Sequence, residues 1–186
     1  GMGFAGTEVT KEAAKMILAD DNFATIVEAV REGRAIFDNI RKFLRYLLSS
    51  NMGEVLTVFF GVVLAGSLGL TSTGEAVVLP LLATQILWIN LVTDSGPALA
   101  MGVDPTTADV MARKPRRLTD RVIDARMWVS VLEIGFVMAV LTLLTIDAYL
   151  PGGLIEGTRD LDNARTAGFT VLVLAQLFNC FNTRSE

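Results

Sequence analysis

Residues 49–70 read SSNMGEVLTVFFGVVLAGSLGL, and Glu54 is the one charged residue among them. The stretch belongs to a longer apolar run, Leu44–Leu70, which is long enough to cross the roughly 30 Å hydrocarbon core of a bilayer. An ionised carboxylate at that depth costs roughly 2.5–3.5 kcal/mol even on lenient insertion scales. Glu54, together with Asn51 three residues before it, is therefore a candidate for a functional site inside a membrane.

Three further apolar stretches predict membrane-spanning helices: Val77–Met101, Met127–Ile146 and Ala167–Thr183. The last is near the lower length limit for a span. Of the 186 residues 52% are hydrophobic, and the mean hydropathy is +0.50. The sequence thus predicts a mainly α-helical, polytopic transmembrane bundle. Its expected segments are a soluble remnant (1–22), a stalk with the first span (23–70), further spans (77–101, 127–149 and 167–183), a basic loop (102–126) and an outward loop (150–166).

Basic residues predict the orientation, because they are enriched in cytoplasmic segments. Lys and Arg residues precede the first span and fill the 102–126 loop, whereas the loop between the first two spans has none. Both ends of the chain and the 102–126 loop are therefore expected in the cytoplasm. This bias accounts for the basic loop without nucleic acid, so the bilayer is an expected partner and nucleic acid is not.

The residue types available restrict the chemistry of any site. The chain has no histidine, and its single cysteine, Cys180, lies in an apolar segment and excludes an intrachain disulfide. A metal site must therefore be built from oxygen ligands.

The N-terminal residues are typical of the end of a soluble α/β domain, with a glycine-rich opening and a possible short strand in MILAD, residues 16–20. From Asp21 or Asn22 the pattern predicts one helix without a proline as far as Leu70. Its apolar positions follow three-and-four spacing, and the same stripe reaches Asn51 and Glu54. This spacing predicts that both side chains face neighbouring helices and not lipid.

The second predicted span carries a similar polar group. Asn90, Thr93 and Asp94 share one helix face, and Pro97 cannot donate the hydrogen bond that the Thr93 carbonyl would accept. We expect the helix to be unwound around residues 93–96, where freed carbonyls can bind a cation.

The side chains of Asn51, Glu54, Asn90, Thr93 and Asp94 offer about seven oxygens, and calcium takes 6–8. The two carboxylates would balance the charge of one calcium ion. The alternative is that these residues form interhelical hydrogen bonds of about 0.6 kcal/mol each. Gln176 and Asn179, three apart in the last span, are tentative additional ligands, since hydrogen bonding is at least as good an explanation for them.

At these residues the sequence resembles the P-type ATPases, in particular the calcium-transporting branch typified by the sarcoplasmic/endoplasmic reticulum pump. LADDNFATIVEAVREGRAIFDNIRKFLRYLLSSNMGEV (18–55) resembles the end of the phosphorylation domain passing into the fifth membrane helix. Residues 81–105 resemble the sixth helix, ARKPRR (112–117) the following loop, and residues 169–186 the eighth helix. The resemblance implies that Asn51, Glu54, Asn90, Thr93 and Asp94 match positions that coordinate transported calcium.

The resemblance also implies what residues 1–186 do not carry. The family's phosphorylated aspartate, nucleotide-binding and actuator domains and first four membrane helices have no counterpart here, so ATP and magnesium are expected to bind elsewhere in a parent protein. The stretch alone is expected to be inactive, with the remaining helices and cytoplasmic domains as its partners. Gln176 stands where two-site calcium pumps carry a glutamate, which predicts one calcium per cycle.

Two other functions stay open from the sequence. A pump of the same class could move sodium, potassium or protons, in which case one carboxylate would have to be protonated. A non-enzymatic four-helix membrane subunit or channel could use the same polar residues for structure alone.

Overall fold

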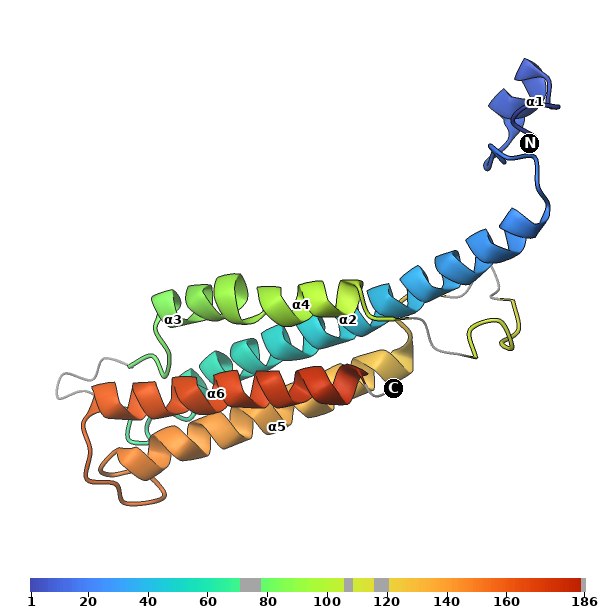
Figure 1. Cartoon of the computed structure of the whole chain (residues 1–186). Helices are drawn as coiled ribbons and strands as arrows, with labels where there is room; N and C mark the ends of the chain where they lie inside the picture. The colour runs from blue at the N-terminus through green and yellow to red at the C-terminus, as the bar shows by residue number, and fades with distance from the viewer. Residues whose placement is uncertain (71–77, 106–108, 116–120, 185–186) are drawn as a thin grey trace. The chain divides into compact units, whose positions relative to one another are not determined.

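The computed structural model describes residues 1–70, 78–105, 109–115 and 121–184, and these residues are mainly helical, as predicted (Figure 1). The helices are α1 (Glu8–Ala13), α2 (Ala24–Val63), α3 (Ala83–Trp88), the π-helix η1 (Ile89–Thr93), α4 (Ser95–Gly102), α5 (Ala125–Tyr149) and α6 (Leu161–Arg184). The chain divides into two compact units, Gly1–Asn39 with Asp104–Asp120, and Ile40–Val103 with Arg121–Glu186.

The first unit contains α1 and the first part of α2. Thr7 caps α1, since its side chain accepts the N–H of Thr10. The strand expected in MILAD is reduced to one isolated parallel bridge between Met2 and Leu18, and no strand occurs in the described ranges. A short strand with a single pairing partner has too few hydrogen bonds to extend.

Helix α2 begins where predicted, because the side chain of Asn22 accepts the N–H of Ala24 at 3.0 Å. Its 40 residues correspond to about 60 Å of helix, well over the thickness of one bilayer. In the first unit Arg34 donates to the carbonyls of Val110 and Arg113, both at 2.9 Å. These bonds attach the described part of the basic loop to the stalk.

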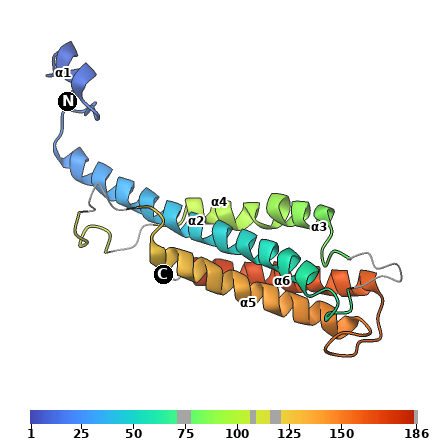
Figure 2. The same cartoon turned by 180° about the vertical axis from the view of Figure 1, so that it is seen from behind.

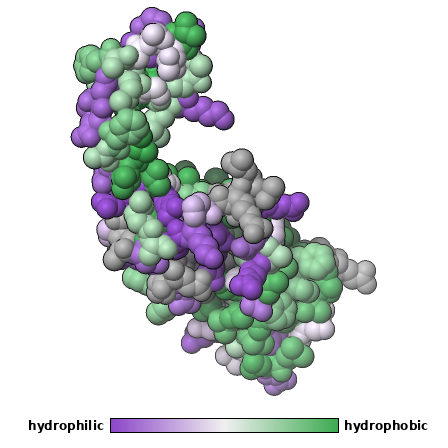
Figure 3. Space-filling model, turned by 90° about the vertical axis from the view of Figure 1, so that its right-hand side faces the viewer, coloured by the Kyte–Doolittle hydropathy of each residue, from purple (hydrophilic) through white to green (hydrophobic). Residues whose placement is uncertain are grey.

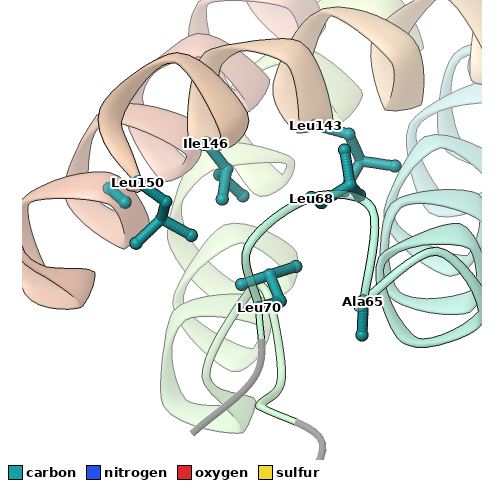
Figure 4. Packing of buried hydrophobic residues seen from close by; sticks show 7 residues of the cluster. Ala65, Leu68, Leu70, Leu143, Ile146 and Leu150 are labelled. Carbon is teal, nitrogen blue, oxygen red and sulfur yellow. The ribbon is translucent and has the colours of Figure 1, made fainter. Parts of the chain in front are cut away.

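The expectation that this helix runs to Leu70 is wrong, since it ends at Val63 and is followed by turns. Gly69 closes the turn with φ of +67°, a conformation that glycine adopts without steric cost. The turn places Leu68 and Leu70 in an apolar cluster with residues of α5 and α6 (Figure 4). Burial of these leucines favours the turn over a longer helix.

In the second unit α2, α5 and α6 lie side by side (Figures 1 and 2). Glycines allow close approach. A Cβ on Gly135 of α5 would meet Met52 Cγ at 2.8 Å and the Gly53 nitrogen at 3.1 Å, and one on Gly168 of α6 would meet Ile146 Cγ1 at 2.6 Å. Small residues at such contacts are typical of packed membrane helices.

In the part of the chain that the structure describes, three helices, α2, α5 and α6, are long and apolar enough to cross a membrane. Helix α6 spans 24 residues and begins at Leu161, six residues before the predicted start. Many exposed side chains in the second unit are large and apolar, and green areas mark such residues in the space-filling view (Figure 3). They include Val55, Phe59, Leu132, Phe136, Val137, Leu174, Phe178 and Phe181.

Candidate functional site

Glu54 lies at the centre of a buried polar cluster in the second unit. Its side chain is 3% exposed, and both carboxylate oxygens accept hydrogen bonds from amides. Asn90 donates to Oε2 at 2.7 Å, and Gln176 donates to Oε1 at 3.0 Å. Residues that are 36 and 122 positions away in the sequence thus meet at one carboxylate.

Asp94 is the second buried carboxylate, at 2% exposed. The hydroxyl of Tyr46 donates to its Oδ1 at 3.0 Å, while Oδ2 has no hydrogen-bond partner among the described residues. Tyr46 is fully buried and was not among the predicted site residues. Eight residues leave about 80° between Tyr46 and Glu54 around α2, so spacing within this helix did not point to Tyr46.

The tentative residues Gln176 and Asn179 are both buried, from the same face of α6. Asn179 donates to Ser49 Oγ at 2.7 Å, and Ser49 in turn donates to the carbonyl of Tyr46. Five buried side-chain oxygens of this unit have no hydrogen-bond partner among the described residues. They are Ser50 Oγ, Asp94 Oδ2, Thr142 Oγ1, Gln176 Oε1 and Asn179 Oδ1. Buried acceptors without donors carry a desolvation penalty that a cation or water would relieve.

The prediction that Asn51 faces inward with Glu54 is wrong for the described chain. Asn51 is exposed, and its side chain donates to the carbonyl of Leu47 at 2.8 Å. Of these two side chains, only that of Glu54 is buried in the described chain.

The remaining predicted residues are on the second span. Asn90 is largely exposed although it reaches Glu54, and Thr93 is half-buried beside Asp94. Both lie at the π-helix, so their carbonyls are in a widened turn.

The predicted unwinding around residues 93–96 is wrong in its form and position. Asp94 keeps right-handed helical angles of φ −81° and ψ −27°, and its carbonyl accepts the N–H of Ala98 at 3.1 Å. The irregularity is the π-helix Ile89–Thr93, in which the N–H of Asp94 reaches back five residues to Ile89. The helix therefore takes up an extra residue one turn before Pro97 and does not unwind; such π segments are frequent at functional sites.

Glu54 and Asp94 are both buried in the second unit. Their described hydrogen bonds come from Asn90, Gln176 and Tyr46, and none comes from a basic side chain. No group of three or more His, Cys, Asp and Glu side chains arranged for a metal occurs among the described residues. Two carboxylates with neutral oxygens nevertheless suit a hard cation such as calcium.

Comparisons with known proteins agree with this chemistry. Residues 78–186 match the family described as "Cation transporting ATPase, C-terminus". A "Calcium-transporting ATPase" of Bacillus subtilis is 45% identical over 188 residues, which cover 100% of this chain and 19% of the relative. "Calcium-transporting ATPase 2, endoplasmic reticulum-type" of Arabidopsis thaliana is 45% identical over 142 residues, covering 76% of this chain and 12% of the relative. The chain thus spans a fifth or less of the length of these two curated relatives.

Proposed function

Because the chain belongs to the cation-transporting ATPase family, we propose that it is part of the membrane domain of an ATP-driven pump that transports calcium. The three candidate spans and the family make it a multi-pass integral membrane protein. The relatives that match over the whole chain or most of it are named calcium-transporting ATPases, which supports calcium as the transported ion.

The observation that carries the proposal is the pair of buried carboxylates whose hydrogen bonds, within the described residues, come from neutral groups. Glu54 and Asp94 are each at most 3% exposed, and their described partners are amides and a phenol. Buried charges of this kind are strongly unfavourable unless they are compensated. A transported divalent cation would supply the compensation.

We propose Asp94 as the principal ligand, because among the described residues its Oδ2 is the one oxygen of these two carboxylates without a partner. Asn90 and Thr93, on the same turn of the second span, are proposed to add neutral oxygens. Glu54, Gln176 and Asn179 complete the surrounding polar cluster. Asn51 is proposed as a ligand only if its exposed side chain turns away from Leu47.

Calcium fits this set better than the alternatives. With neither histidine nor a second cysteine, the chain does not favour a soft transition metal, and magnesium keeps its waters in a stricter octahedron. A sodium or potassium ion would leave one of the two carboxylates uncompensated. A purely structural membrane subunit is disfavoured by the family match.

In the proposed topology both ends of the chain and the basic loop face the cytoplasm. These segments carry most of the Lys and Arg residues, which are enriched on the cytoplasmic side of membrane proteins. ATP and magnesium would act at sites outside residues 1–186, in the parent protein's cytoplasmic domains. Helix α2 begins in the first unit and reaches Glu54, so it is suited to carry movement from those domains to the ion site.

The experiment is to purify the full-length parent protein and to measure which cation stimulates its ATPase activity. Micromolar calcium is expected to stimulate it, and sodium, potassium and magnesium alone are not. Stimulation by a monovalent ion without calcium would overturn the choice of ion, and an ATPase indifferent to every cation would overturn the proposed function.

Tyr46→Phe tests the hydrogen bond to Asp94 in the same protein. The substitution leaves a buried carboxylate with no donor, so we expect the ion-free protein to lose about 1–3 kcal/mol of stability. Calcium should restore most of this loss, because it replaces the missing donor. Thermal unfolding with and without calcium measures both effects, and an equal loss in both conditions would contradict the prediction.

A further inference from the structure

The residues that lead into α3 are held in place by α6. The carbonyl of Leu79 accepts two hydrogen bonds from the guanidinium of Arg165, one from Nε at 3.2 Å and one from Nη2 at 3.0 Å. The planar guanidinium presents its donors as a rigid fork, so two bonds to one oxygen fix the position of that oxygen. Arg165 therefore holds the chain just before the first helix of the second span.

The next residue, Pro80, packs against a glycine of α2. Both Pro80 and Gly61 are buried. A Cβ on Gly61 would overlap Pro80 Cγ and would lie 3.0 and 3.1 Å from Pro80 Cβ and Cδ. The closed ring of proline cannot bend away as a long side chain can. The two residues therefore fit together because residue 61 has no side chain.

Leu81 is attached to the second unit by apolar packing. It is 1% exposed and belongs to a cluster whose other buried members are Ile89 of η1, Met138 of α5 and Leu172 of α6. Burial of its side chain favours the observed position of the chain. The three successive residues 79–81 are thus held by α6, by α2 and by this cluster, in that order.

The contacts of residues 79–81 lie on the same faces of α2 and α6 as the polar cluster. Gly61 follows Glu54 by seven residues, which is about two turns of α2 and leaves about 20° between them around the helix. Arg165 precedes Gln176 by eleven residues, which is about three turns of α6 with a similar offset. In the proposed topology both steps lead from the cluster toward the outward side. Residues 79–81 therefore lie across the outward path along both faces.

We propose that residues 79–81 are an outward gate of the ion site and that Arg165 is the positioning residue that holds this gate closed. The inference rests on the proposed function. A pump that alternates access must stay closed on the outward side while its site is open to the cytoplasm. The side chain of Arg165 is half-buried, so water can replace the Leu79 carbonyl as its partner when the gate opens.

Arg165→Gln in the full-length parent protein should loosen the gate and leave the ion site intact. Glutamine is shorter and uncharged, so the two charged donors to the Leu79 carbonyl are lost. We expect the passive leak of calcium to rise about five- to tenfold, as fits the loss of a half-exposed charged donor. The calcium transported per ATP should fall. The calcium concentration for half-maximal ATPase activity should stay unchanged, because Arg165 lies about three turns from Gln176.

Sealed vesicles that contain the purified parent protein give these quantities. Calcium uptake and ATP hydrolysis are measured together, and the leak is the calcium efflux after ATP is removed. Both are expressed per site phosphorylated from ATP, so that unfolded protein does not count. Arg159→Gln is the matched control, because Arg159 lies in the same outward loop and its described bond runs from its backbone N–H to the Tyr149 carbonyl. Normal leak and normal calcium per ATP in Arg165→Gln, or the same change in Arg159→Gln, would overturn the role of Arg165.

Gly61→Ala tests the gate from the α2 side. The added methyl group should displace Pro80, so the leak should rise although Arg165 is intact. Gly66→Ala is its control, because among the described residues a Cβ on Gly66 would meet nothing within 4 Å. A leak in Gly61→Ala no greater than in Gly66→Ala would show that Pro80 does not close the outward path.

A reducible cross-link tests whether the gate must open. Leu79→Cys and Arg165→Cys are introduced into a parent protein without other cysteines and joined by a short bis-methanethiosulfonate spacer. Linked protein should still be phosphorylated from ATP in the presence of calcium but should not transport calcium, and reduction should restore transport. Transport by the linked protein at the rate of the reduced protein would refute the proposal. A parent protein without cation-stimulated ATPase activity would instead refute the proposed function, on which the gate depends.

Discussion

Asp94→Asn in the full-length pump is expected to abolish cation-stimulated phosphorylation from ATP. The asparagine has nearly the same shape but carries no charge, and its nitrogen cannot bind a cation. Removal of one partner from a buried ionic contact costs about 3–5 kcal/mol, which weakens ion binding roughly 10²- to 10³-fold or more. Phosphorylation by inorganic phosphate, which in this proposal needs no bound ion, should remain largely intact.

The measurement is the level of phosphorylated protein against calcium concentration, with ATP and then with phosphate as donor. Asp147→Asn is the matched control, because Asp147 is also fully buried but its oxygens accept the N–H groups of Leu154 and Ile155. This control should lower stability and leave calcium dependence unchanged. Normal calcium activation in Asp94→Asn would remove Asp94 from the ion site.

The sequence was sufficient to predict three of the four expected spans, and it predicted the two buried carboxylates; the expected span 77–101 is divided in the described chain into α3, η1 and α4. Long apolar runs and single acids within them depend on the solvation free energy of individual residues, which sequence reports directly. The membrane-crossing lengths of α2, α5 and α6 follow from this, and so does the burial of Glu54 and Asp94.

The sequence did not predict which side chains of each helix face the neighbouring helices. A polar stripe at three-and-four spacing covers a wide arc, so it did not separate buried Glu54 from exposed Asn51. The Tyr46–Asp94 and Ser49–Asn179 hydrogen bonds depend on how two helices face each other, and no spacing within one helix gives that. Pro97 predicted an unwound segment, whereas the irregularity is the π-helix Ile89–Thr93 that precedes it.

The structure also bears on how many ions the pump carries. Both oxygens of Glu54 are occupied by the amides of Asn90 and Gln176, whereas Asp94 Oδ2 is open. If Gln176 were a glutamate, it would face Glu54 with a second charge and the pair would require a cation. The neutral amide instead donates a hydrogen bond to Glu54 and adds no second charge.

One calcium ion bound per pump is therefore the expected result for the full-length protein. Glu54 and Asp94 supply two negative charges, and the family resemblance implies one more from a helix outside this chain. Two calcium ions carry four positive charges, so roughly one would stay uncompensated at low dielectric, which is strongly disfavoured. Equilibrium calcium binding to the purified pump decides the number. Glu54→Gln should still bind one ion, because Glu54 is held by amides, whereas Asp94→Asn should bind none. Two high-affinity ions per pump with Gln176 in place would show that this charge count is wrong, and loss of all binding in Glu54→Gln would make Glu54 a required ligand.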